Sequence, residues 1–146
     1  MKYKKLGKSG IEVSEIGFGA WSIALDWWGK KVEEDEAKRM LKKAYDLGIN
    51  YFETADMYGK GKSEKLIGEV FKGMRDEVVI STKYGYDFSD VEQIGHAELP
   101  QDYSPEYTRK AVDACLERLQ TDHSIRMSIK LIDDGQSAKY VSMSHS

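Results

Sequence analysis

The sequence has almost no cysteine, since Cys115 is the only one among 146 residues. One thiol cannot form a disulfide within the chain, which excludes a disulfide-stapled secreted domain and is typical of a reducing cytosol. The three histidines, His96, His123 and His145, lack the close spacing of metal ligands, and we expect no metal site. With only two prolines, the chain has no proline-rich linker.

Long apolar runs and an excess of either charge are also missing. No stretch approaches the ~20 apolar residues that cross a bilayer, and the opening MKYKKLGKSG has no apolar core of a secretory signal. The 22 basic and 25 acidic residues are interspersed and leave a net charge of −3, with no basic stripe for nucleic acid. These absences predict one soluble, cytoplasmic domain that binds neither nucleic acid nor membrane.

What the sequence does contain is a regular alternation of apolar runs and amphipathic segments. The apolar runs predict strands over residues 15–19, 49–53 and 77–83. Apolar residues three and four positions apart predict helices over 33–47, from a cap at Ser63 through Phe71, and from Ser104-Pro105 through Leu119. This alternation predicts βαβ units around a parallel sheet, which leaves a doubly wound sheet or a (β/α)₈ barrel.

The two ends of the chain have different patterns. Residues 2–13 predict a hairpin that turns at Lys8-Ser9-Gly10, a feature that some barrel families place before their first parallel strand. Beyond residue 120 the helical pattern stops. Apolar residues then alternate over 125–129, which allows a fourth strand, and residues 135–146 are polar and aperiodic, like a frayed end.

Chemically useful side chains follow the predicted strands, at the edge of a parallel sheet where functional residues collect. Glu53 ends the second strand with Tyr58 in the loop after it, and Lys83 ends the third. A phenol with a pKa near ~10 is a weak acid, but a nearby ammonium favours the phenolate and lowers that pKa. The three residues therefore predict a proton-transfer group: Tyr58 is the acid, Lys83 activates it and Glu53 orients Lys83. A packing tyrosine and a solvated lysine are the plainer interpretation.

Other candidate residues have simpler interpretations. The run Gly61-Lys62-Ser63 at a helix start resembles a phosphate loop, yet Asp56 stands where that motif requires its first glycine. Cys115 lies on the apolar face of the third helix, so we interpret it as a core residue rather than a nucleophile. Trp27 and Trp28 form either a binding wall or a hydrophobic patch, and both interpretations stay open.

Four segments of the chain resemble the aldo-keto reductase family. They are LGKSGIEVSEIGFGAW at 6–21, AYDLGINYFETADMYGKGKSEKLIGEVFK at 44–72, VVISTKYG at 78–85 and SPEYTRKAVDACLERLQTD at 104–122, and the likeness extends over about residues 3–122. Members of that family are (β/α)₈ barrels that use NADPH to reduce aldehydes and ketones. The resemblance implies an α/β fold: an incomplete (β/α)₈ TIM barrel with an N-terminal hairpin and three to four βα units. It also implies NADP(H) as cofactor and a small carbonyl compound as substrate.

The resemblance implies roles for individual residues as well. The family's catalytic tyrosine and lysine fall on Tyr58 and Lys83, and its aspartate falls on Glu53, which is one methylene longer. The extra length means that the carboxylate must shift to reach Lys83. The implied cofactor-binding residues are Glu53 again and, where the family has glycine, threonine and tryptophan beside the nicotinamide, Gly19, Ala20 and Trp21.

The likeness ends at Asp122. The family's catalytic histidine should close a fourth strand soon afterwards and is absent, and the family's cofactor-phosphate site lies in its second half. One choice of codons for residues 126–132, read in a shifted frame, gives Asp-Val-Tyr-Gln-Ala-His, close to the missing segment. We therefore expect residues 1–122 to be the N-terminal part of a reductase barrel and 123–146 to be a divergent tail made by a frameshift. A natural tail is the alternative.

Two functions remain on this basis. The first is an NADP-dependent carbonyl reductase that is truncated and inactive as it stands. The second is a non-catalytic fragment that binds a ligand or partner through a self-associated half-barrel. A barrel cut between strands exposes sheet edges and apolar strand residues, so self-association is expected in either case.

Overall fold

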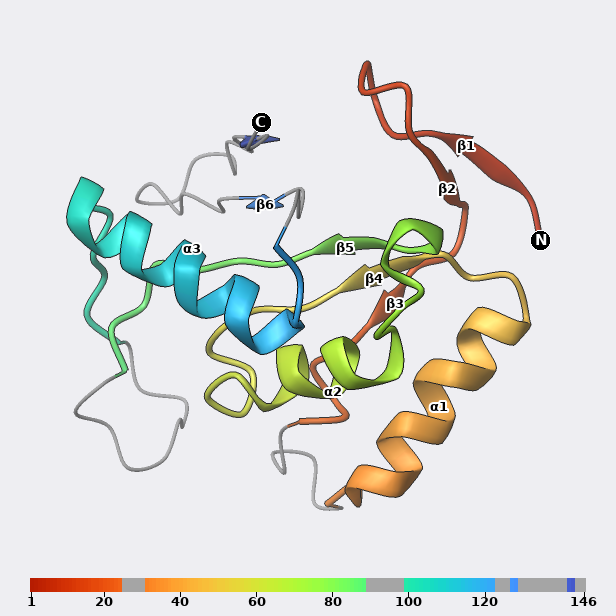
Figure 1. The fold of residues 1–146 in the computed structure, drawn as a ribbon, viewed down its shortest axis with the longest axis horizontal. Helices are drawn as coiled ribbons and strands as arrows, with labels where there is room; N and C mark the ends of the chain where they lie inside the picture. Colours follow the sequence, from red (N-terminus) through yellow and green to blue (C-terminus); the bar gives the residue numbers. More distant parts are fainter. Residues whose placement is uncertain (25–30, 89–98, 123–126, 129–141, 144–146) are drawn as a thin grey trace.

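The computed structural model describes residues 1–24, 31–88, 99–122, 127–128 and 142–143 (Figure 1). Trp27, Trp28 and the three histidines lie outside the described residues. The strands are β1 (Tyr3–Lys5), β2 (Glu12–Ser14), β3 (Phe18–Gly19), β4 (Tyr51–Glu53), β5 (Val79–Ser81), β6 (Met127–Ser128) and β7 (Ser142–Met143). The helices are α1 (Glu34–Asp46), α2 (Lys62–Val70), the short 3₁₀ helix η1 (Arg75–Glu77) and α3 (Pro105–Leu119).

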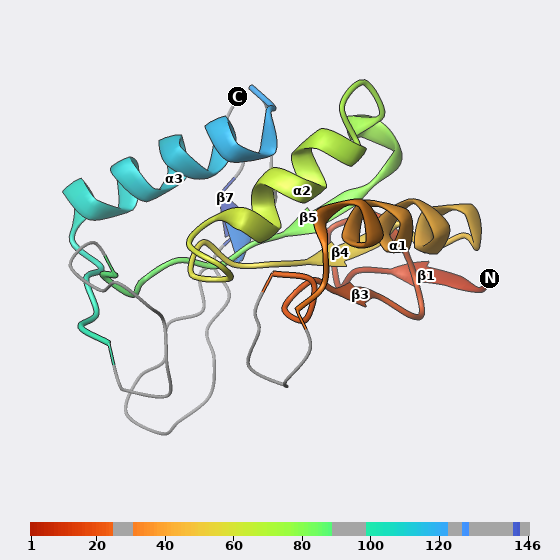
Figure 2. The same cartoon turned by 90° about the horizontal axis from the view of Figure 1, so that it is seen from below.

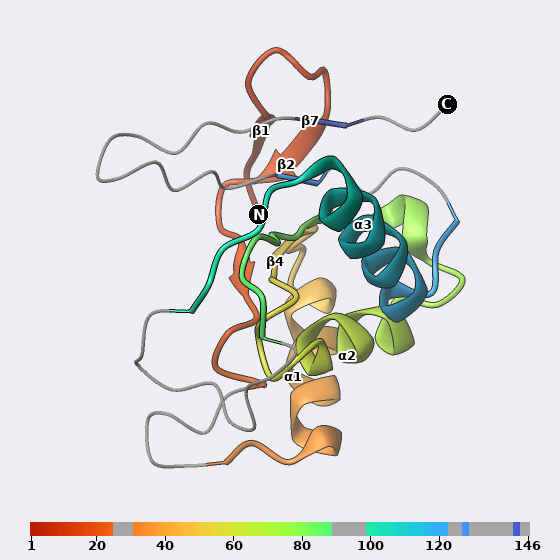
Figure 3. The ribbon, with the colours of Figure 1, turned by 90° about the vertical axis from the view of Figure 1, so that its left-hand side faces the viewer.

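The centre of the fold is a parallel sheet with the strand order β3-β4-β5. Phe18 lies opposite Phe52, and Glu53 lies opposite Ser81, so all three strands end at the same edge. Each strand is followed by a helix, and Figures 2 and 3 show α1, α2 and α3 side by side along one face of the sheet. The expected α/β fold, an incomplete barrel of consecutive βα units, is confirmed.

The expected fourth strand does not extend this sheet. Met127–Ser128 forms β6, but it pairs antiparallel with β7, inside the stretch that we expected to be frayed. Within the described residues, the parallel sheet therefore ends at β5 and the barrel part consists of three βα units.

The predicted hairpin is present and closes the other end of the sheet. β1 and β2 pair antiparallel, and the Leu6 N–H donates to the Ile11 carbonyl at 2.8 Å across the turn. The Ser14 N–H donates to Oδ1 of Asn50 at 2.7 Å, and the Tyr3 hydroxyl donates to the Gly48 carbonyl at 2.8 Å. Since Gly48 and Asn50 precede β4, the hairpin contacts the edge where the parallel strands begin and leaves the opposite edge open for a site.

The hydrophobic core lies between the sheet and the helices. Phe52 of β4 and Ile80 of β5 are buried against Leu41 of α1 and Ile67 of α2. The ring of Phe71, just after α2, lies 4.6 Å from the ring of Phe52, measured between centroids. The apolar spacing read from the sequence therefore marks the faces that these helices turn toward the sheet.

The helix starts differ in how well the sequence predicts them. Ser104 caps α3 as expected, because its Oγ accepts from the Tyr107 N–H at 3.2 Å and Pro105 takes the first helical position. The expected cap at Ser63 is wrong. The cap of α2 is Gly61, whose φ of 83° is in the left-handed region, and Ser63 lies in the first turn with its side chain buried.

Helices α2 and α3 pack closely at Gly68. A Cβ added to Gly68 would lie 2.7 Å from the carbonyl oxygen of Arg118, which is closer than real Cβ atoms come to backbone. Glycine at this position therefore allows α3 to lie against α2, and the contact fixes α3 relative to the sheet.

Candidate functional site

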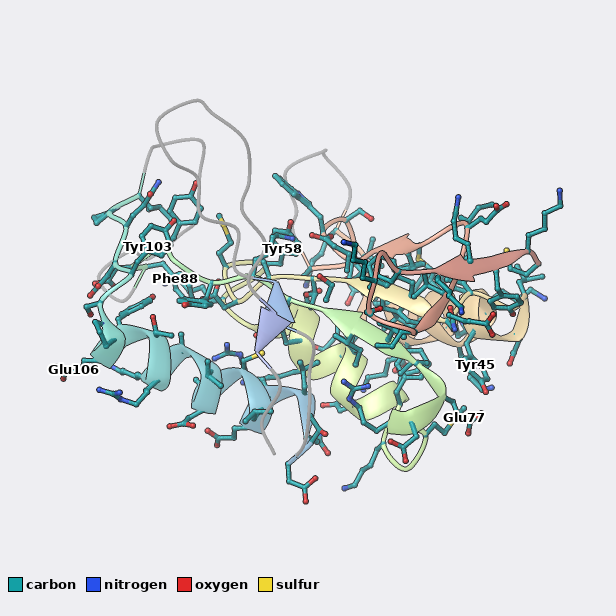
Figure 4. All side chains as sticks on the ribbon, turned by 90° about the horizontal axis from the view of Figure 1, so that it is seen from above. Tyr45, Tyr58, Glu77, Phe88, Tyr103 and Glu106 are labelled. Atoms are coloured by element: carbon teal, nitrogen blue, oxygen red, sulfur yellow. The ribbon has the colours of Figure 1, made fainter. Side chains whose placement is uncertain are left out.

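The ends of the parallel strands bring the expected site residues together. Glu53 is the last residue of β4, Tyr58 lies in the loop that leads to α2, and Lys83 lies two residues beyond β5. In Figure 4, Tyr58 lies on the opposite side of the strand layer from α3 and far from Tyr45 and Glu77. The site therefore forms at the carboxyl edge of the sheet, which is where parallel α/β folds gather functional groups.

Glu53, Tyr58 and Lys83 form one hydrogen-bonded group. The Lys83 ammonium forms an ion pair with Oε1 of Glu53 and donates to the Thr54 carbonyl oxygen at 3.0 Å. The Tyr58 hydroxyl donates to the same Glu53 oxygen at 3.4 Å, and Nζ of Lys83 lies 4.8 Å from the centre of the Tyr58 ring. A glutamate at position 53 therefore reaches both the lysine and the tyrosine.

The lowering of the Tyr58 pKa that we expected from Lys83 stays a prediction, and the structure adds one influence that opposes it. Burial raises the pKa of the Tyr58 phenol above its ordinary value, because the phenolate would lose hydration. The ammonium of Lys83 is bonded to a carboxylate and a carbonyl, so its charge is already largely compensated. The phenol consequently stays protonated at neutral pH, which is the form that an acid catalyst needs.

The residues that follow β3 line one side of this group. Gly19 is exposed, and Trp21 is 37% exposed with its ring centroid 5.2 Å from that of Tyr58. Ala20 is fully buried, and its N–H donates to the Glu53 carbonyl at 2.8 Å. Gly19 and Trp21 are therefore accessible to a ligand at the strand ends, whereas Ala20 takes part through its backbone.

Asp56 is a second carboxyl group in the same loop. It is only 5% exposed, and burial together with the nearby charge of Glu64 raises its pKa to about 7. Its backbone N–H donates to the Lys83 carbonyl at 3.0 Å, so the loop that carries Tyr58 is tied to the end of β5.

Sequence reasoning missed a layer of buried polar residues directly behind the site. Ser63 and Glu64 of α2 are fully buried, as are Thr54 and Thr82 at the strand ends. A signal for the helix pair was present. The apolar positions 66, 67, 70 and 71 define the buried face of α2, and continuing the same spacing toward the N-terminus reaches 63 and 64.

The two alternatives that the sequence raised have structural explanations. Cys115 is 1% exposed, and its thiol donates to Oε1 of Glu64 at 3.0 Å. Burial raises the pKa of this thiol, so the interpretation as a core residue is confirmed. At Gly61, an added Cβ would lie 2.3 Å from Cδ of Arg118, so the space that a phosphate loop would need is filled by a side chain. None of the described helices is long and apolar enough to span a membrane.

Comparisons with known proteins agree with this arrangement. The sequence model described as the aldo/keto reductase family matches residues 15–125. The chain is 34% identical over 123 residues to the uncharacterized oxidoreductase YqkF of Bacillus subtilis (strain 168), a match that covers 84% of this chain and 37% of the relative. It is 30% identical over 158 residues to the probable aldo-keto reductase 1 of Glycine max, covering 96% of this chain and 44% of the relative.

A solved structure shows the same partial overlap. The aldo-keto reductase AKR11C1 from Bacillus halodurans, in its holo form, superposes with a TM-score of 0.77 at 35% identity. The superposition covers 92% of this chain and 42% of that protein. The chain therefore spans less than half the length of these relatives.

Proposed function

The chain belongs to the aldo/keto reductase family, and from that premise we propose that it supplies the proton-donating part of an NADP-dependent carbonyl reductase. The observation that carries the proposal is the bonded group of Glu53, Tyr58 and Lys83 at the carboxyl edge of the sheet. The substrate class is a small aldehyde or ketone, whose oxygen needs a proton once its carbon has been reduced.

Each residue of the group has a distinct part in this proposal. Tyr58 donates its phenolic proton to the carbonyl oxygen, for which its protonated state at neutral pH is suited. The ammonium of Lys83 stabilises the phenolate that forms, because the two groups are already close. Glu53 holds Lys83 in place through their ion pair and keeps that ammonium charged.

The cofactor's nicotinamide end fits the residues after β3. The indole of Trp21 is partly exposed beside Tyr58, and an added Cβ at Gly19 would approach only Oε2 of Glu53, at 3.9 Å. Gly19 and Trp21 would contact the nicotinamide ring. Ala20 would take part through its backbone, and Glu53 through its carboxylate. NADPH, when bound, supplies the hydride.

The experiment restores the rest of a barrel around this site. Residues 1–122 replace the corresponding segment of the Bacillus halodurans relative, and the chimera is assayed for NADPH consumption with a simple aromatic aldehyde. We expect turnover that the Tyr58→Phe variant lowers by about 10²–10⁴-fold with NADPH binding preserved. Tyr45→Phe is the matched control, because it removes a hydrogen-bonded phenol of α1 remote from the site.

The chimera also tests the finer parts of the proposal. Unchanged turnover in Tyr58→Phe would show that another group is the acid, and faster reduction with NADH than with NADPH would contradict the NADP assignment. The 146-residue chain alone should reduce the same aldehyde negligibly, because the family's catalytic histidine has no counterpart in the sequence after Asp122. Turnover of about 1–10³ s⁻¹ by that chain would contradict the proposed inactivity.

A second candidate function, self-association, is favoured by a hollow of about 700 Å³ beside α1, whose exposed surface is mostly apolar. Its lining combines charged side chains of α1 with apolar ones. The charged residues are Glu36, Arg39, Lys42, Lys43 and Asp46, and the apolar residues are Phe18, Met40, Ala44, Leu47 and Ile49. Leu47 is 60% exposed, and β3 lies at one edge of the parallel sheet. A second copy of the chain that covered this hollow would bury apolar surface that water now contacts.

A further inference from the structure

Two consecutive residues in the first turn of α2 bond to all three strand ends of the site. Oγ of Ser63 donates to the Ala20 carbonyl oxygen after β3 at 3.1 Å and accepts from Oγ1 of Thr54 after β4 at 2.8 Å. Oε1 of Glu64 accepts from Oγ1 of Thr82 after β5 at 2.6 Å. Ser63, Glu64, Thr54 and Thr82 are each fully buried, so water does not compete for these bonds.

Each residue bonded in this way is a direct neighbour of a residue in the site. Thr54 follows Glu53, Thr82 precedes Lys83, and Ala20 lies between Gly19 and Trp21. Successive side chains of an extended segment point to opposite faces. The threonines therefore point toward α2 while Glu53 and Lys83 point into the site, and a bond behind each strand end fixes the side chain in front of it.

Two groups of α3 also bond to the Glu64 carboxylate. Its Oε2 accepts from Nε of Arg118 of α3 at 2.6 Å, and the Cys115 thiol donates to its Oε1. A buried carboxylate with this many donors keeps a fixed orientation, because turning it would break several hydrogen bonds at once. Glu64 is thus a rigid acceptor for the Thr82 hydroxyl.

We propose that Ser63 and Glu64 are positioning residues, which act through Thr54 and Thr82 to hold Glu53 and Lys83 in their ion pair beneath Tyr58. The inference rests on the proposed function, since it assigns these bonds to the same proton-transfer group. It predicts that removing the Thr82 hydroxyl, which donates to Glu64, loosens the Lys83 ammonium.

The test follows the Lys83 ammonium directly by ¹⁵N NMR of the full chain at mildly acidic pH. An ammonium held by a carboxylate and a carbonyl exchanges its protons with water slowly, and Lys83→Arg assigns the signal by removing it. In Thr82→Val, which keeps the shape and removes the donor, we expect exchange to become about fivefold faster, equivalent to ~1 kcal/mol of lost restraint. Thr82→Ser, which restores the hydroxyl, should exchange like the unchanged protein.

The matched control is Thr108→Val. Thr108 accepts a hydrogen bond from the Tyr84 hydroxyl at 3.0 Å, outside this network, so its loss should lower thermal stability without changing Lys83. Ser63→Ala is the second variant, for use if Thr82→Val does not fold, and alanine keeps the helix propensity of this position. It should also speed the exchange of the Lys83 ammonium protons. Unchanged exchange in both Thr82→Val and Ser63→Ala, or equally fast exchange in Thr108→Val, would overturn the proposal.

The exchange rate of the Lys83 ammonium protons is measured without substrate or cofactor, so it does not depend on turnover. The positioning role can therefore be established in a chain that reduces no aldehyde, and it can fail in a chimera that is fully active. The two proposals are separated in either case.

Discussion

The carboxylate of Glu53 holds the ammonium of Lys83 across the boundary between β4 and β5. Glu53 lies opposite Ser81 in the strand register, so its side chain extends along the sheet to reach a residue two positions further on. The side chain of glutamate is one methylene longer than that of aspartate, which helps it to reach Lys83. The pair also places a positive charge beside a phenol whose burial opposes ionisation.

Replacing Lys83 with methionine should raise the pKa of Tyr58 further. The substitution keeps much of the side-chain volume and removes a positive charge that favours the phenolate, so we expect the pKa of Tyr58 to shift upward. The titration is followed by ¹³C NMR of the tyrosine rings, and the Tyr58→Phe variant identifies the signal of Tyr58 by removing it. Lys42→Met is the control, because Lys42 lies 5.1 Å from the ring centre of Tyr45 instead. An unchanged Tyr58 titration would show that Lys83 does not influence the phenol.

Asp56 should make the fold less stable as the pH rises. Its pKa is about 7 in the folded chain against 3.8 for an ordinary aspartate, so between these values the folded state binds a proton that the unfolded state has released. The free energy of unfolding therefore falls through this window, by up to roughly 4 kcal/mol, and levels off above it. Asp56→Asn should remove the slope in denaturant titrations at several pH values.

An exposed aspartate provides the comparison for this pH dependence. Asp113 lies on the outer face of α3, so Asp113→Asn should keep the slope of the unchanged chain. Parallel pH profiles for Asp56→Asn and the unchanged chain would contradict the buried, protonated carboxyl that the structure indicates.

The isolated chain should self-associate through the hollow beside α1. In sedimentation velocity runs over a range of concentrations, we expect the unchanged chain to form dimers or larger species. Leu47→Lys, which places a charge in the hollow, should shift the distribution toward monomer. Leu6→Lys changes an exposed leucine of the hairpin and should have little effect. A monomer that unfolds sharply on heating would refute this expectation and favour a self-sufficient fold.

The gene should contain the missing family segment in another reading frame. We propose that residues 123–146 arise from a frameshift, so the nucleotides that encode 126–132 should read Asp-Val-Tyr-Gln-Ala-His, or a close relative of it, when shifted. Sequencing the gene beyond codon 146 checks this, because the shifted reading frame should continue to encode the family pattern. Codons that cannot give such a segment would leave a natural tail as the explanation.

The sequence predicted the parts of the fold that depend on local patterns. The apolar spacing of α1 and α2, the Ser104-Pro105 start of α3 and the turn of the hairpin each follow from residues close together in the chain. The cluster of Glu53, Tyr58 and Lys83 was also foreseen, because parallel strands bring their ends together.

The errors came from interactions between residues far apart in the chain. Ser63 has the composition of a helix cap, yet its hydroxyl bonds to Ala20 and Thr54, and a left-handed glycine takes the capping position. The burial that raises the pKa of Tyr58 likewise depends on the packing around its ring, which the spacing of residues along the chain does not show. The apolar spacing of α2 reaches Glu64, but what bonds to its buried carboxylate does not follow from that spacing, because Arg118 lies 54 residues further along the chain.

That separation has a consequence for the order in which the chain can assemble on the ribosome. Glu53, Tyr58, Lys83 and the whole of α2 are synthesised first, but Glu64 then lacks the two groups of α3 that bond to its carboxylate, the Arg118 guanidinium and the Cys115 thiol. The close contact at Gly68 likewise needs α3. The nascent chain should therefore stay protease-sensitive until Arg118 has left the exit tunnel and become protected only then, so that the carboxyl end of α3 decides when the edge of β5 becomes rigid.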